Sequence, residues 1–262
     1  MADRLTGEQP SGGLPAAVRR RLDPEARFGL RLSLALVGLI LVAVPFAALL
    51  ISVRRDGVLL DLDRSVATGL HGWLRDHDTT ATGLKVVSAI GTFAGLGTLV
   101  IVAAGVLLRS GRRRLLAFLL ATTVGGWVLN NAVKLAVGRQ RPTFDDPLAT
   151  ARGLSFPSGH AMSSTVVLGA LLMVFLPALR PSRRTPVVLA TAGLVLLIGF
   201  TRLALGVHYL TDVVAGLVLG GAWLALCVAA FSVWRVERGR RPVDPLEGLE
   251  PEASGALRDA AH

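Results

Sequence analysis

Six apolar runs separated by polar loops divide the chain between about residues 32 and 234. The first run covers about 32–53, roughly 22 residues, which is long enough for a helix to cross a hydrocarbon core of about 30 Å. A cleaved signal peptide is the alternative for this run, but its apolar region would be only about 7 to 15 residues long. The other runs cover about 84–108, 115–137, 160–179, 186–203 and 212–234. The pattern therefore predicts an all-α integral membrane protein with six transmembrane helices.

Polar segments flank these runs. Residues 1–28 are rich in Gly, Pro and charge, residues 236–262 carry several Pro, Glu and Arg, and both are predicted to be disordered tails. One membrane domain remains, over residues 29–235. Between the first two runs, apolar side chains recur every three or four positions, which predicts a helix lying in the membrane surface with His71 at the surface. The apolar positions of that helix are Leu59, Leu62, Val66, Leu70 and Trp73.

Composition supports a membrane protein. Hydrophobic residues make up 52% of the 262 positions, and the mean hydropathy is +0.57, which is too apolar for an ordinary soluble domain. The net charge of +10 would suit nucleic acid, but the basic residues fall in short clusters between apolar runs, as orientation signals do, so no nucleic-acid partner is expected. The single cysteine, Cys227, excludes an intramolecular disulfide and a Cys-based metal site.

The distribution of arginines predicts the orientation. Arginines dominate the N-terminal tail, the second and fourth loops and the C-terminal flank, whereas the first loop balances arginines against aspartates. By the positive-inside tendency, both termini of this multi-pass cell-membrane protein face the cytoplasm. Lys134 and Arg202 then lie near the outer ends of their spans, and His160 and Asp212 lie at the outer beginnings of the next ones. These polar residues therefore meet on the extracytoplasmic face, at the outer ends of helices 3 to 6.

The residues gathered there fit an anion site. A cation beside apolar helices costs roughly 2.5 to 3.5 kcal/mol on insertion scales unless it faces a cavity or a ligand, which applies to Lys134, Arg141 and Arg202. An arginine fork matches phosphate oxygens. Ser158 and Gly159 directly precede a helix, whose first N–H groups bind anions, and glycine lets an oxygen approach the backbone closely. The implied ligand is tetrahedral and multiply charged.

Two histidines and a carboxylate complete a candidate catalytic set. His208 and Asp212 are four residues apart, so on a helical turn the carboxylate accepts a hydrogen bond from one ring nitrogen and leaves the other free to attack phosphorus. His160, from another helix, is suited to protonate the departing oxygen. This set needs no metal and no cofactor.

Several of these residues also have structural interpretations. Asp212 and Ser158 are both common helix N-cap residues. Tyr209 either touches a lipid head group or packs at the membrane interface. The pair Asp145 and Asp146 is interpreted as solvated, or paired with an arginine, rather than as a magnesium site.

The order and spacing of the candidate residues closely resemble the type 2 phosphatidic acid phosphatase family. The resemblance covers about residues 84–235, and one departure is Thr201, which stands where many members have serine but keeps a hydroxyl. It rests on three motifs in order: Lys134 with Arg141-Pro142, then Pro157-Ser158-Gly159-His160, then Arg202 with His208 and Asp212.

The resemblance implies a six-span helical fold and metal-independent removal of phosphate from a membrane lipid phosphate or diphosphate. It implies a phosphohistidine at His208 oriented by Asp212, and acid catalysis by His160. It assigns phosphate binding to Lys134, Arg141, Ser158, Gly159 and Arg202. Vanadium haloperoxidases share this anion-site pattern, but they are soluble and larger.

The sequence leaves the substrate open among isoprenyl (undecaprenyl-type) diphosphate, phosphatidic acid, phosphatidylglycerol phosphate and diacylglycerol diphosphate. The abundance of Ala, Arg, Gly, Leu and Val is typical of a high-GC bacterium and favours recycling of an isoprenyl diphosphate. Two alternatives to hydrolysis remain, a lipid-linked phosphotransferase and a non-catalytic anion-binding membrane protein. The oligomeric state is open as well.

Overall fold

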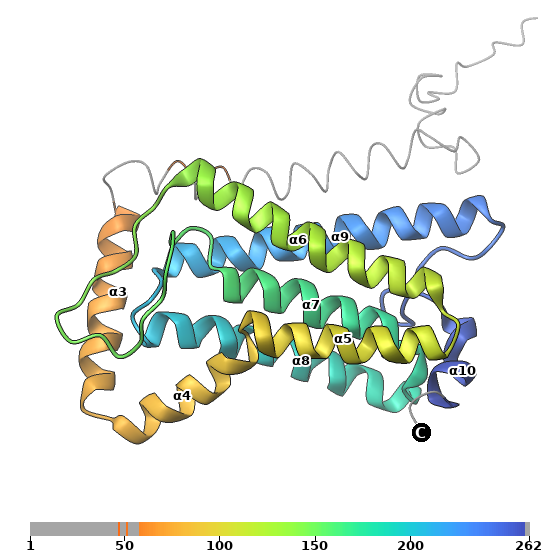
Figure 1. The fold of residues 1–262 in the computed structure, drawn as a ribbon, viewed down its shortest axis with the longest axis horizontal. Helices are drawn as coiled ribbons and strands as arrows, with labels where there is room; N and C mark the ends of the chain where they lie inside the picture. Colours follow the sequence, from red (N-terminus) through yellow and green to blue (C-terminus); the bar gives the residue numbers. More distant parts are fainter. Residues whose placement is uncertain (1–46, 48–50, 52–57, 260–262) are drawn as a thin grey trace, which may run out of the picture. The chain divides into compact units, whose positions relative to one another are not determined.

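The computed structural model describes residues 47, 51 and 58–259, which belong to one compact unit. The first predicted span and the N-terminal tail lie outside the described residues, apart from residues 47 and 51. Helices and connecting loops make up the described part, which contains no strand beyond an isolated bridge between Asp244 and Gly248. The elements (Figure 1) are α3 (Val58–Arg75), α4 (Asp78–Ile90), α5 (Phe93–Arg109), α6 (Arg113–Val137), α7 (Gly159–Phe175), η1 (Leu176–Ala178), α8 (Pro181–Ala204), α9 (Leu210–Glu237), η2 (Pro251–Ala253) and α10 (Ser254–Asp259).

Four helices in the described part are long and apolar enough to cross a membrane: α6, α7 continued by η1, α8 and α9. They correspond to the last four apolar runs of the sequence. α4 and α5 together satisfy the same criteria if the bent pair is counted as one span. The all-α fold with several membrane-spanning helices is therefore confirmed, whereas the number six stays a prediction.

The second apolar run, expected to form one span, is broken into α4 and α5 with a bend of 41°. α4 ends at Ile90 with Gly91 as its C-cap, and the Thr92 side chain caps α5 by accepting a hydrogen bond from the Gly95 N–H at 3.1 Å. A Cβ at Gly95 would lie 2.6 Å from the carbonyl oxygens of Ala89 and Ile90, so the turn requires glycine there. The hydropathy of the sequence does not reveal this break, because the capping residue Thr92 and two glycines barely change the mean hydropathy of the run.

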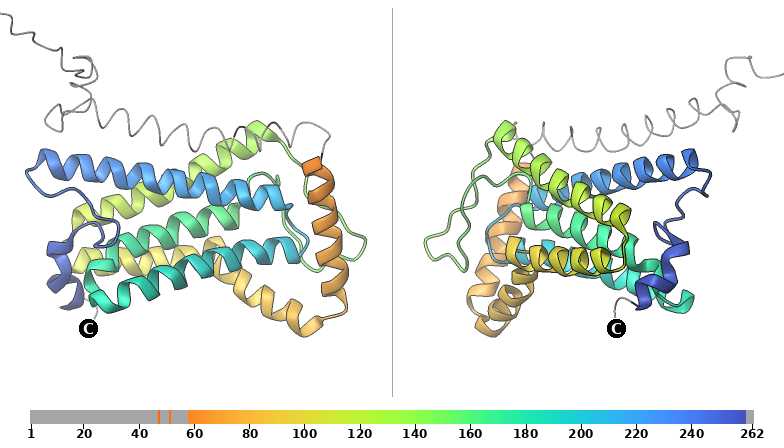
Figure 2. Two further views of the ribbon diagram at one scale, coloured as in Figure 1. Left: turned by 180° about the vertical axis from the view of Figure 1, so that it is seen from behind. Right: turned by 45° about the vertical axis from the view of Figure 1, so that its right-hand side comes forward.

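α7 is the central helix and packs against α5, α6, α8 and α9 (Figures 1 and 2). Its closest neighbour is α9, which presents glycines to it. A Cβ at Gly216 would lie 2.7 Å from the Ser158 carbonyl oxygen, and one at Gly220 would lie 3.0 Å from the Met162 carbonyl oxygen. Small residues at such crossings let two helix backbones approach closely. This contact fixes the start of α9 against the start of α7.

α3 lies across one end of the bundle of long helices (Figures 1 and 2). The buried face of α3 carries Asp63, Ala67, His71 and Leu74. The interpretation of His71 as a surface residue is wrong, because its side chain is only 6% exposed and its ring stacks on Phe144 at 3.9 Å between centroids. Phe144 belongs to the loop between α6 and α7, so the sequence around His71 does not indicate that a phenylalanine ring covers it.

The apolar stripe expected on α3 lies beside this buried face. Leu59, Leu62 and Trp73 are all substantially exposed, and Trp73 is the most exposed of the three at 53%. Their place on the outer side agrees with a helix that contacts the membrane surface. The expected membrane face and the observed buried face are therefore two different sides of α3.

The C-terminal segment differs from the predicted disordered tail. Residues as far as 259 are described, and Arg235 at the end of α9 pairs with Glu252 at 2.8 Å. The segment folds back onto the bundle end opposite α3 (Figure 1) because it contains apolar side chains at spacings of four, which are buried in the core formed with α5, α6 and α7: Leu249, Ala253 and Leu257.

Candidate active site

The predicted site residues lie together at the bundle end that α3 crosses. Lys134 is in the last turn of α6 and Arg202 in the last turn of α8, while His160 and Asp212 are in the first turns of α7 and α9. The helices run alternately, so these two C-terminal ends and two N-terminal ends meet (Figure 1). The loops 138–158 and 205–209 bring the remaining candidates to the same place.

His208 is buried in the loop between α8 and α9. Its Nδ1 faces Asp212 Oδ2 at 3.4 Å and Ser155 Oγ at 3.3 Å, and its Nε2 lies 2.9 Å from Arg141 Nη1. A guanidinium only donates, so Nε2 accepts and Nδ1 carries the hydrogen of the neutral ring. Burial lowers the pKa of His208 to about 4, against the opposing effect of the Asp212 carboxylate. The imidazole is therefore neutral near pH 7, as a nucleophile requires.

The Asp212 carboxylate is fully buried and held on both oxygens. Arg139 Nη1 donates to Oδ1 at 2.7 Å, while Oδ2 accepts hydrogen bonds from the Tyr209 N–H at 2.9 Å and from the Ser155 hydroxyl. The bond from Tyr209 also caps the start of α9. Tyr209, however, is the N-cap residue and Asp212 stands at the third helical position, so the interpretation of Asp212 as an N-cap residue is wrong.

Lys134 and Arg141 hold the loop between α6 and α7 against the site. Lys134 Nζ donates to the carbonyl oxygens of Leu154 at 2.7 Å and Pro157 at 2.8 Å. Arg141 donates from Nε to the Gly153 carbonyl at 2.9 Å, and from Nη1 to the Val207 carbonyl at 2.8 Å as well as to His208. Both cations are half-buried, and Arg141 links the two loops directly. Burial lowers the pKa of Arg141, which nevertheless stays cationic near pH 7.

Arg202 is buried, with 7% of its surface exposed. Its Nη1 donates to the Ser88 hydroxyl on α4, and its carbonyl accepts from the N–H groups of Val207 and His208 at 3.2 Å each. No hydrogen-bond partner of its Nε lies in the part of the chain that the structure describes. A buried donor without a partner is rare in folded proteins, so this Nε is available to an anionic ligand.

The start of α7 carries Ser158, Gly159 and His160. The Ser158 hydroxyl caps the helix by accepting from the Ala161 N–H at 3.5 Å, and the Ser158 N–H donates to the Asp212 carbonyl at 2.9 Å. Around Gly159 a Cβ would meet only ordinary contacts, the nearest at 3.6 Å, so packing leaves room beside this backbone. Within residues 58–259, His160 Nε2 is buried and has no partner. The first turn of α7 therefore combines a buried imidazole nitrogen with backbone that no side chain crowds.

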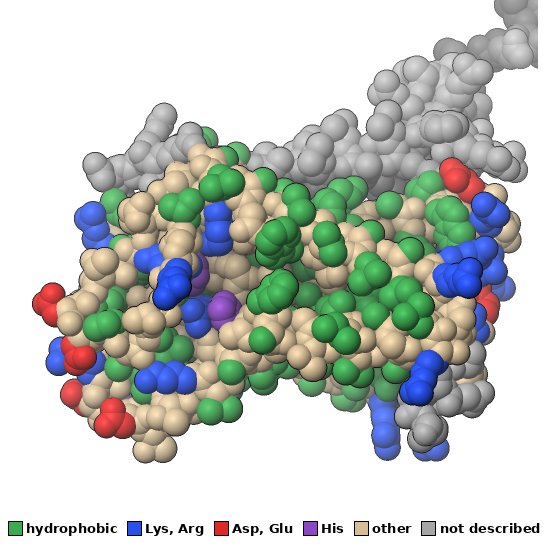
Figure 3. All heavy atoms as spheres, in the orientation of Figure 1, with side chains coloured by type: hydrophobic (Ala, Val, Ile, Leu, Met, Phe, Trp, Pro, Cys, Tyr) green, Lys and Arg blue, Asp and Glu red, His purple; other side chains and the backbone are tan. Residues whose placement is uncertain are grey.

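Positive charge accumulates around this imidazole. His160 interacts electrostatically with His208 and with three cations: Arg202, Arg141 and Lys134. Figure 3 shows Lys, Arg and His side chains together in a hollow beside α6, near the end that carries α3. A hollow lined by charges of one sign attracts an oppositely charged ligand. The site is electrostatically suited to a phosphate.

Arg139 and Asp63 are the principal residues that the sequence analysis missed. Arg139 bridges the carboxylates of Asp63 and Asp212, and its guanidinium lies 4.2 Å from the centroid of the Tyr209 ring. Tyr209, whose role was open, thus packs on Arg139. One signal was present in the sequence, because Asp63 stands one helical turn before the small and apolar positions at 67, 70 and 74, on the same side of α3. An acidic residue within such a stripe usually has a buried partner.

No metal site is evident in the described part of the chain, where no three His, Cys, Asp or Glu side chains are grouped so as to hold an ion. Asp146 is highly exposed, and its carboxylate lies 3.5 Å from Arg75 on α3. This contact agrees with the interpretation of the Asp145 and Asp146 pair as a solvated or arginine-paired site.

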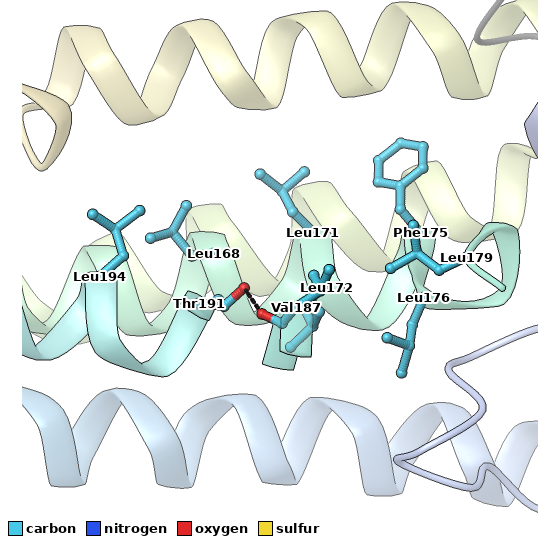
Figure 4. Close-up of a pocket in the computed structure, with 9 residues that line it drawn as sticks. All are labelled: Leu168, Leu171, Leu172, Phe175, Leu176, Leu179, Val187, Thr191 and Leu194. Carbon is cyan, nitrogen blue, oxygen red and sulfur yellow. Dashed lines mark hydrogen bonds between the residues drawn. The ribbon is translucent and has the colours of Figure 1, made fainter. Parts of the chain in front are cut away.

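A separate pocket of about 290 Å³ lies between α7 and α8, away from the candidate residues. Its only polar side chain, Thr191, donates its hydroxyl hydrogen to the Val187 carbonyl at 2.8 Å (Figure 4). The pocket offers no charged group to a phosphate and is not a candidate for the chemistry. Its other lining residues are Leu168, Leu171, Leu172, Phe175, Leu176, Leu179 and Leu194.

Comparison with known proteins identifies the family. Residues 114–235 match the family model of the PAP2 superfamily. The chain is 37% identical over 158 residues to a decaprenylphosphoryl-5-phosphoribose phosphatase from Mycolicibacterium smegmatis, an alignment that covers 58% of this chain and 79% of the relative. The chain belongs to the PAP2 superfamily. The family resemblance drawn from the three motifs is thereby confirmed.

Other members of the PAP2 superfamily are similar over shorter stretches. Identity to a phosphatidylglycerophosphatase B from Bacillus subtilis is 39% over 97 residues, or 36% of this chain and 46% of the relative. A lipid A 1-phosphatase from Rhizobium etli is 34% identical over 122 residues, or 43% and 48% of the two chains. The chain thus spans about half the length of these two relatives.

The fold also matches a solved PAP2 structure. The crystal structure of a transmembrane PAP2 type phosphatidylglycerolphosphate phosphatase from Bacillus subtilis superposes with a TM-score of 0.64 at 23% identity, covering 72% of this chain and 92% of that chain. This likeness shows the shared helical fold.

Proposed function

We propose that this PAP2 protein is a phosphatase of membrane lipid phosphates that works through a phosphohistidine at His208. The arrangement of the His208 ring carries the proposal. Nδ1 faces a buried, fully held carboxylate, while Nε2 lies 2.9 Å from Nη1 of Arg141. The ring also interacts electrostatically with Lys134 and His160. A transport or binding protein would need the cations but not an oriented, neutral imidazole among them. The three curated relatives described above are all named phosphatases.

In the first step, the Nε2 lone pair of His208 attacks phosphorus and the bond from phosphorus to the leaving oxygen breaks. His160 gives a proton to that oxygen, which departs as the lipid alcohol or lipid monophosphate. Attack makes the His208 ring cationic, and the Asp212 carboxylate stabilises it through the Nδ1 hydrogen. Lys134, Arg141 and Arg202 stabilise the charge on the phosphoryl oxygens.

In the second step, water attacks the phosphorus of the phosphohistidine. His160, now neutral at the nitrogen that gave its proton, takes one proton from the water. The bond from phosphorus to Nε2 breaks, inorganic phosphate leaves, and the electron pair returns to the His208 ring. Both histidines then have the protonation states with which the cycle began.

The substrate class is a lipid whose phosphate reaches one end of the helix bundle while its tails stay in the bilayer. The relatives are named for a phosphatidylglycerophosphate, a lipid A 1-phosphate and a decaprenyl-linked sugar phosphate, which share only a phosphate on a membrane lipid. Because the decaprenyl-linked relative is matched over most of its length, we rank isoprenyl-linked phosphates and diphosphates first, ahead of phosphatidylglycerol phosphate and phosphatidic acid.

For the topology, we propose an extracytoplasmic site and cytoplasmic termini. Arginines surround the turn between α5 and α6 and the turn between α7 and α8, both at the end of the bundle opposite the site (Figures 1 and 3). Such clusters mark the cytoplasmic side. These residues are Arg109, Arg112, Arg113, Arg114, Arg180, Arg183 and Arg184.

Phosphate release by the purified protein tests the proposal. We expect release from at least one of undecaprenyl diphosphate, phosphatidic acid and phosphatidylglycerol phosphate, unchanged by EDTA and abolished in His208→Ala. A phosphorylated lipid product without free phosphate would indicate transfer to another acceptor. Binding of phosphate without turnover on any substrate, in folded protein, would indicate a non-catalytic anion-binding protein.

A further inference from the structure

Asp63, Arg139 and Asp212 form a chain of charged side chains in which Arg139 lies between the two carboxylates. Asp212, at one end of this chain, faces the proposed nucleophile His208. Arg139 Nη2 lies 2.7 Å from Asp63 Oδ2, and Arg139 Nη1 lies 2.7 Å from Asp212 Oδ1. The exposed fractions of the three side chains are 1%, 9% and 0%. Because water is excluded, each charge in this chain depends strongly on its neighbours.

Additional contacts fix the chain in place. Asp63 Oδ1 accepts the Thr211 N–H at 2.9 Å, and Oδ2 accepts the Thr211 hydroxyl. Arg139 Nη1 also donates to the Thr211 hydroxyl oxygen at 2.8 Å, and its planar face rests on the Tyr209 ring. The chain of charges thus joins α3, the loop after α6 and the start of α9. Those are the elements that surround His208.

The charge balance of this chain matters for His208. If Arg139 met only Asp212, one positive charge would offset the one negative charge that faces the ring. Since Arg139 is shared with Asp63, the three groups together carry a net charge of −1. Against the effect of burial, the two carboxylates raise the pKa of Arg139, so the guanidinium stays charged. Asp212 therefore remains effectively anionic toward His208, although a cation touches it.

We propose that Asp63 and Arg139 are positioning residues for the reaction of His208: Arg139 fixes the Asp212 carboxylate, and Asp63 takes up enough of the Arg139 charge to leave Asp212 anionic toward the ring. The inference rests on the proposed function for its catalytic meaning. The rival explanation is a buried ion pair that only anchors α3 and acts on stability alone.

The two explanations predict different pH profiles. Asp63→Asn leaves the whole Arg139 charge acting on Asp212, so protonation of His208 becomes less favourable and the acid limb of kcat/KM moves to lower pH. Arg139→Gln removes a positive charge, so the acid limb moves to higher pH. A purely structural pair gives no such opposite displacement. The other charged groups that face His208 are the same in both variants: Lys134, Arg141, His160 and Asp212.

The experiment compares wild type with Asp63→Asn and Arg139→Gln in hydrolysis of the best substrate from about pH 2 to 8, a range that extends to both sides of the acid limb expected from the His208 pKa of about 4. Asp61→Asn and Arg152→Gln, which change exposed side chains in the same segments, are the matched controls. We expect kcat to fall about tenfold to a hundredfold in the two test variants with KM within about threefold, as for groups that orient a reacting residue. We also expect the acid limbs of kcat/KM of the two test variants to move in opposite directions, and the two control variants to match wild type. Unchanged kcat in either test variant, or limbs displaced in the same direction, would overturn the inference.

A second measurement separates this inference from the proposed hydrolysis. The chain has five histidines, and NMR titration of histidine-labelled protein in detergent, assigned with His208→Gln, follows the His208 ring without substrate. If wild type releases no phosphate, the proposed function fails, yet opposite displacements of the His208 titration still support the charge relationship. An unchanged His208 titration in both folded variants rejects it. If a variant does not fold, Arg139→Lys replaces Arg139→Gln: it keeps the charge but not the fork, and we expect its limb to stay near that of wild type while kcat falls.

Discussion

The guanidinium Nη1 of Arg141 lies 2.9 Å from Nε2 of His208, the nitrogen proposed to attack phosphorus. The lone pair of the proposed nucleophile therefore accepts a hydrogen bond from a residue proposed to bind phosphate. An incoming phosphate offers the guanidinium better acceptors, since charge-assisted bonds to phosphate oxygens are stronger than a bond to neutral imidazole. We therefore expect substrate binding to free the nucleophile, with Arg141 turning onto the phosphate.

This contact predicts that Arg141→Lys is severely impaired although the charge is kept. An ammonium cannot hold the Gly153 and Val207 carbonyls and the phosphate together, as the fork does. We expect kcat/KM for lipid phosphate hydrolysis to fall at least about a hundredfold, corresponding to about 2.7 kcal/mol of transition-state stabilisation. Arg152→Lys, at an exposed position in the same loop, is the control and should match wild type. Activity of Arg141→Lys close to that of wild type would show that Arg141 does not bind the substrate phosphate.

The burial of His208 predicts an unusual acid limit for activity. Its pKa is lowered to about 4, so the ring stays neutral and nucleophilic well below the usual histidine pKa of about 6.5. On the acid side, kcat/KM should fall in a step near pH 4, after correction for ionisation of the substrate phosphate. The free energy of unfolding should also decrease at acid pH. Below about pH 6.5 the unfolded chain binds a proton at His208 and the folded chain does not, so the folded state becomes less stable as the pH falls toward 4. An acid limb centred near 6.5 would mean that the ring is not desolvated as described.

The site residues that sequence reasoning identified share one property, namely that their positions follow from helix ends. Lys134, His160, Arg202 and Asp212 stand at the boundaries of apolar runs, and alternation of spans brings those boundaries together. Neither step needs knowledge of the packing. Local patterns therefore sufficed for the last four long helices and for bringing these four residues to one end of the bundle.

The missed features depend on contacts between distant segments. Asp63 meets Arg139 across 76 positions of sequence, and Phe144 covers His71 from a loop without periodicity. The bend after α4 depends on the cap at Thr92, to which hydropathy is insensitive. In each case the competing local interpretation was the commoner one, such as a charged residue facing water. Only tertiary packing distinguishes the two possibilities.

Ser155 is predicted to assist His208 through Asp212. Its hydroxyl donates to Asp212 Oδ2 and its oxygen lies 3.3 Å from His208 Nδ1, so it helps to align the carboxylate and the ring. A hydrogen bond to a charged group contributes about 1.5 to 3 kcal/mol, so Ser155→Ala should lower kcat roughly tenfold to a hundredfold and change KM little. Ser164→Ala is the control, because that buried hydroxyl donates only to the Ala161 carbonyl in its own helix. Equal kinetic losses in both variants would point to general loosening of the bundle.

The crossing of α7 and α9 predicts a glycine on which site geometry depends. A Cβ at Gly216 would lie 2.7 Å from the Ser158 carbonyl oxygen and 3.0 Å from the Ala161 Cβ, so Gly216→Ala has to push α9 away from the turn that carries His160. Such overpacking typically costs about 1 to 3 kcal/mol, and it acts on the Ser158 N–H bond to Asp212.

Gly221→Ala is the matched control, since a Cβ there meets nothing within 4 Å and alanine favours the helix by about 0.8 to 1 kcal/mol. Thermal unfolding in detergent should show a lower midpoint for Gly216→Ala and an equal or higher one for Gly221→Ala. Hydrolysis should fall more than tenfold only in the former, because a displacement of about 1 Å at a reacting group has an effect of that size. Wild-type stability and turnover in Gly216→Ala would show that the two helix ends are not in the close contact on which the alignment of Asp212 and His160 depends.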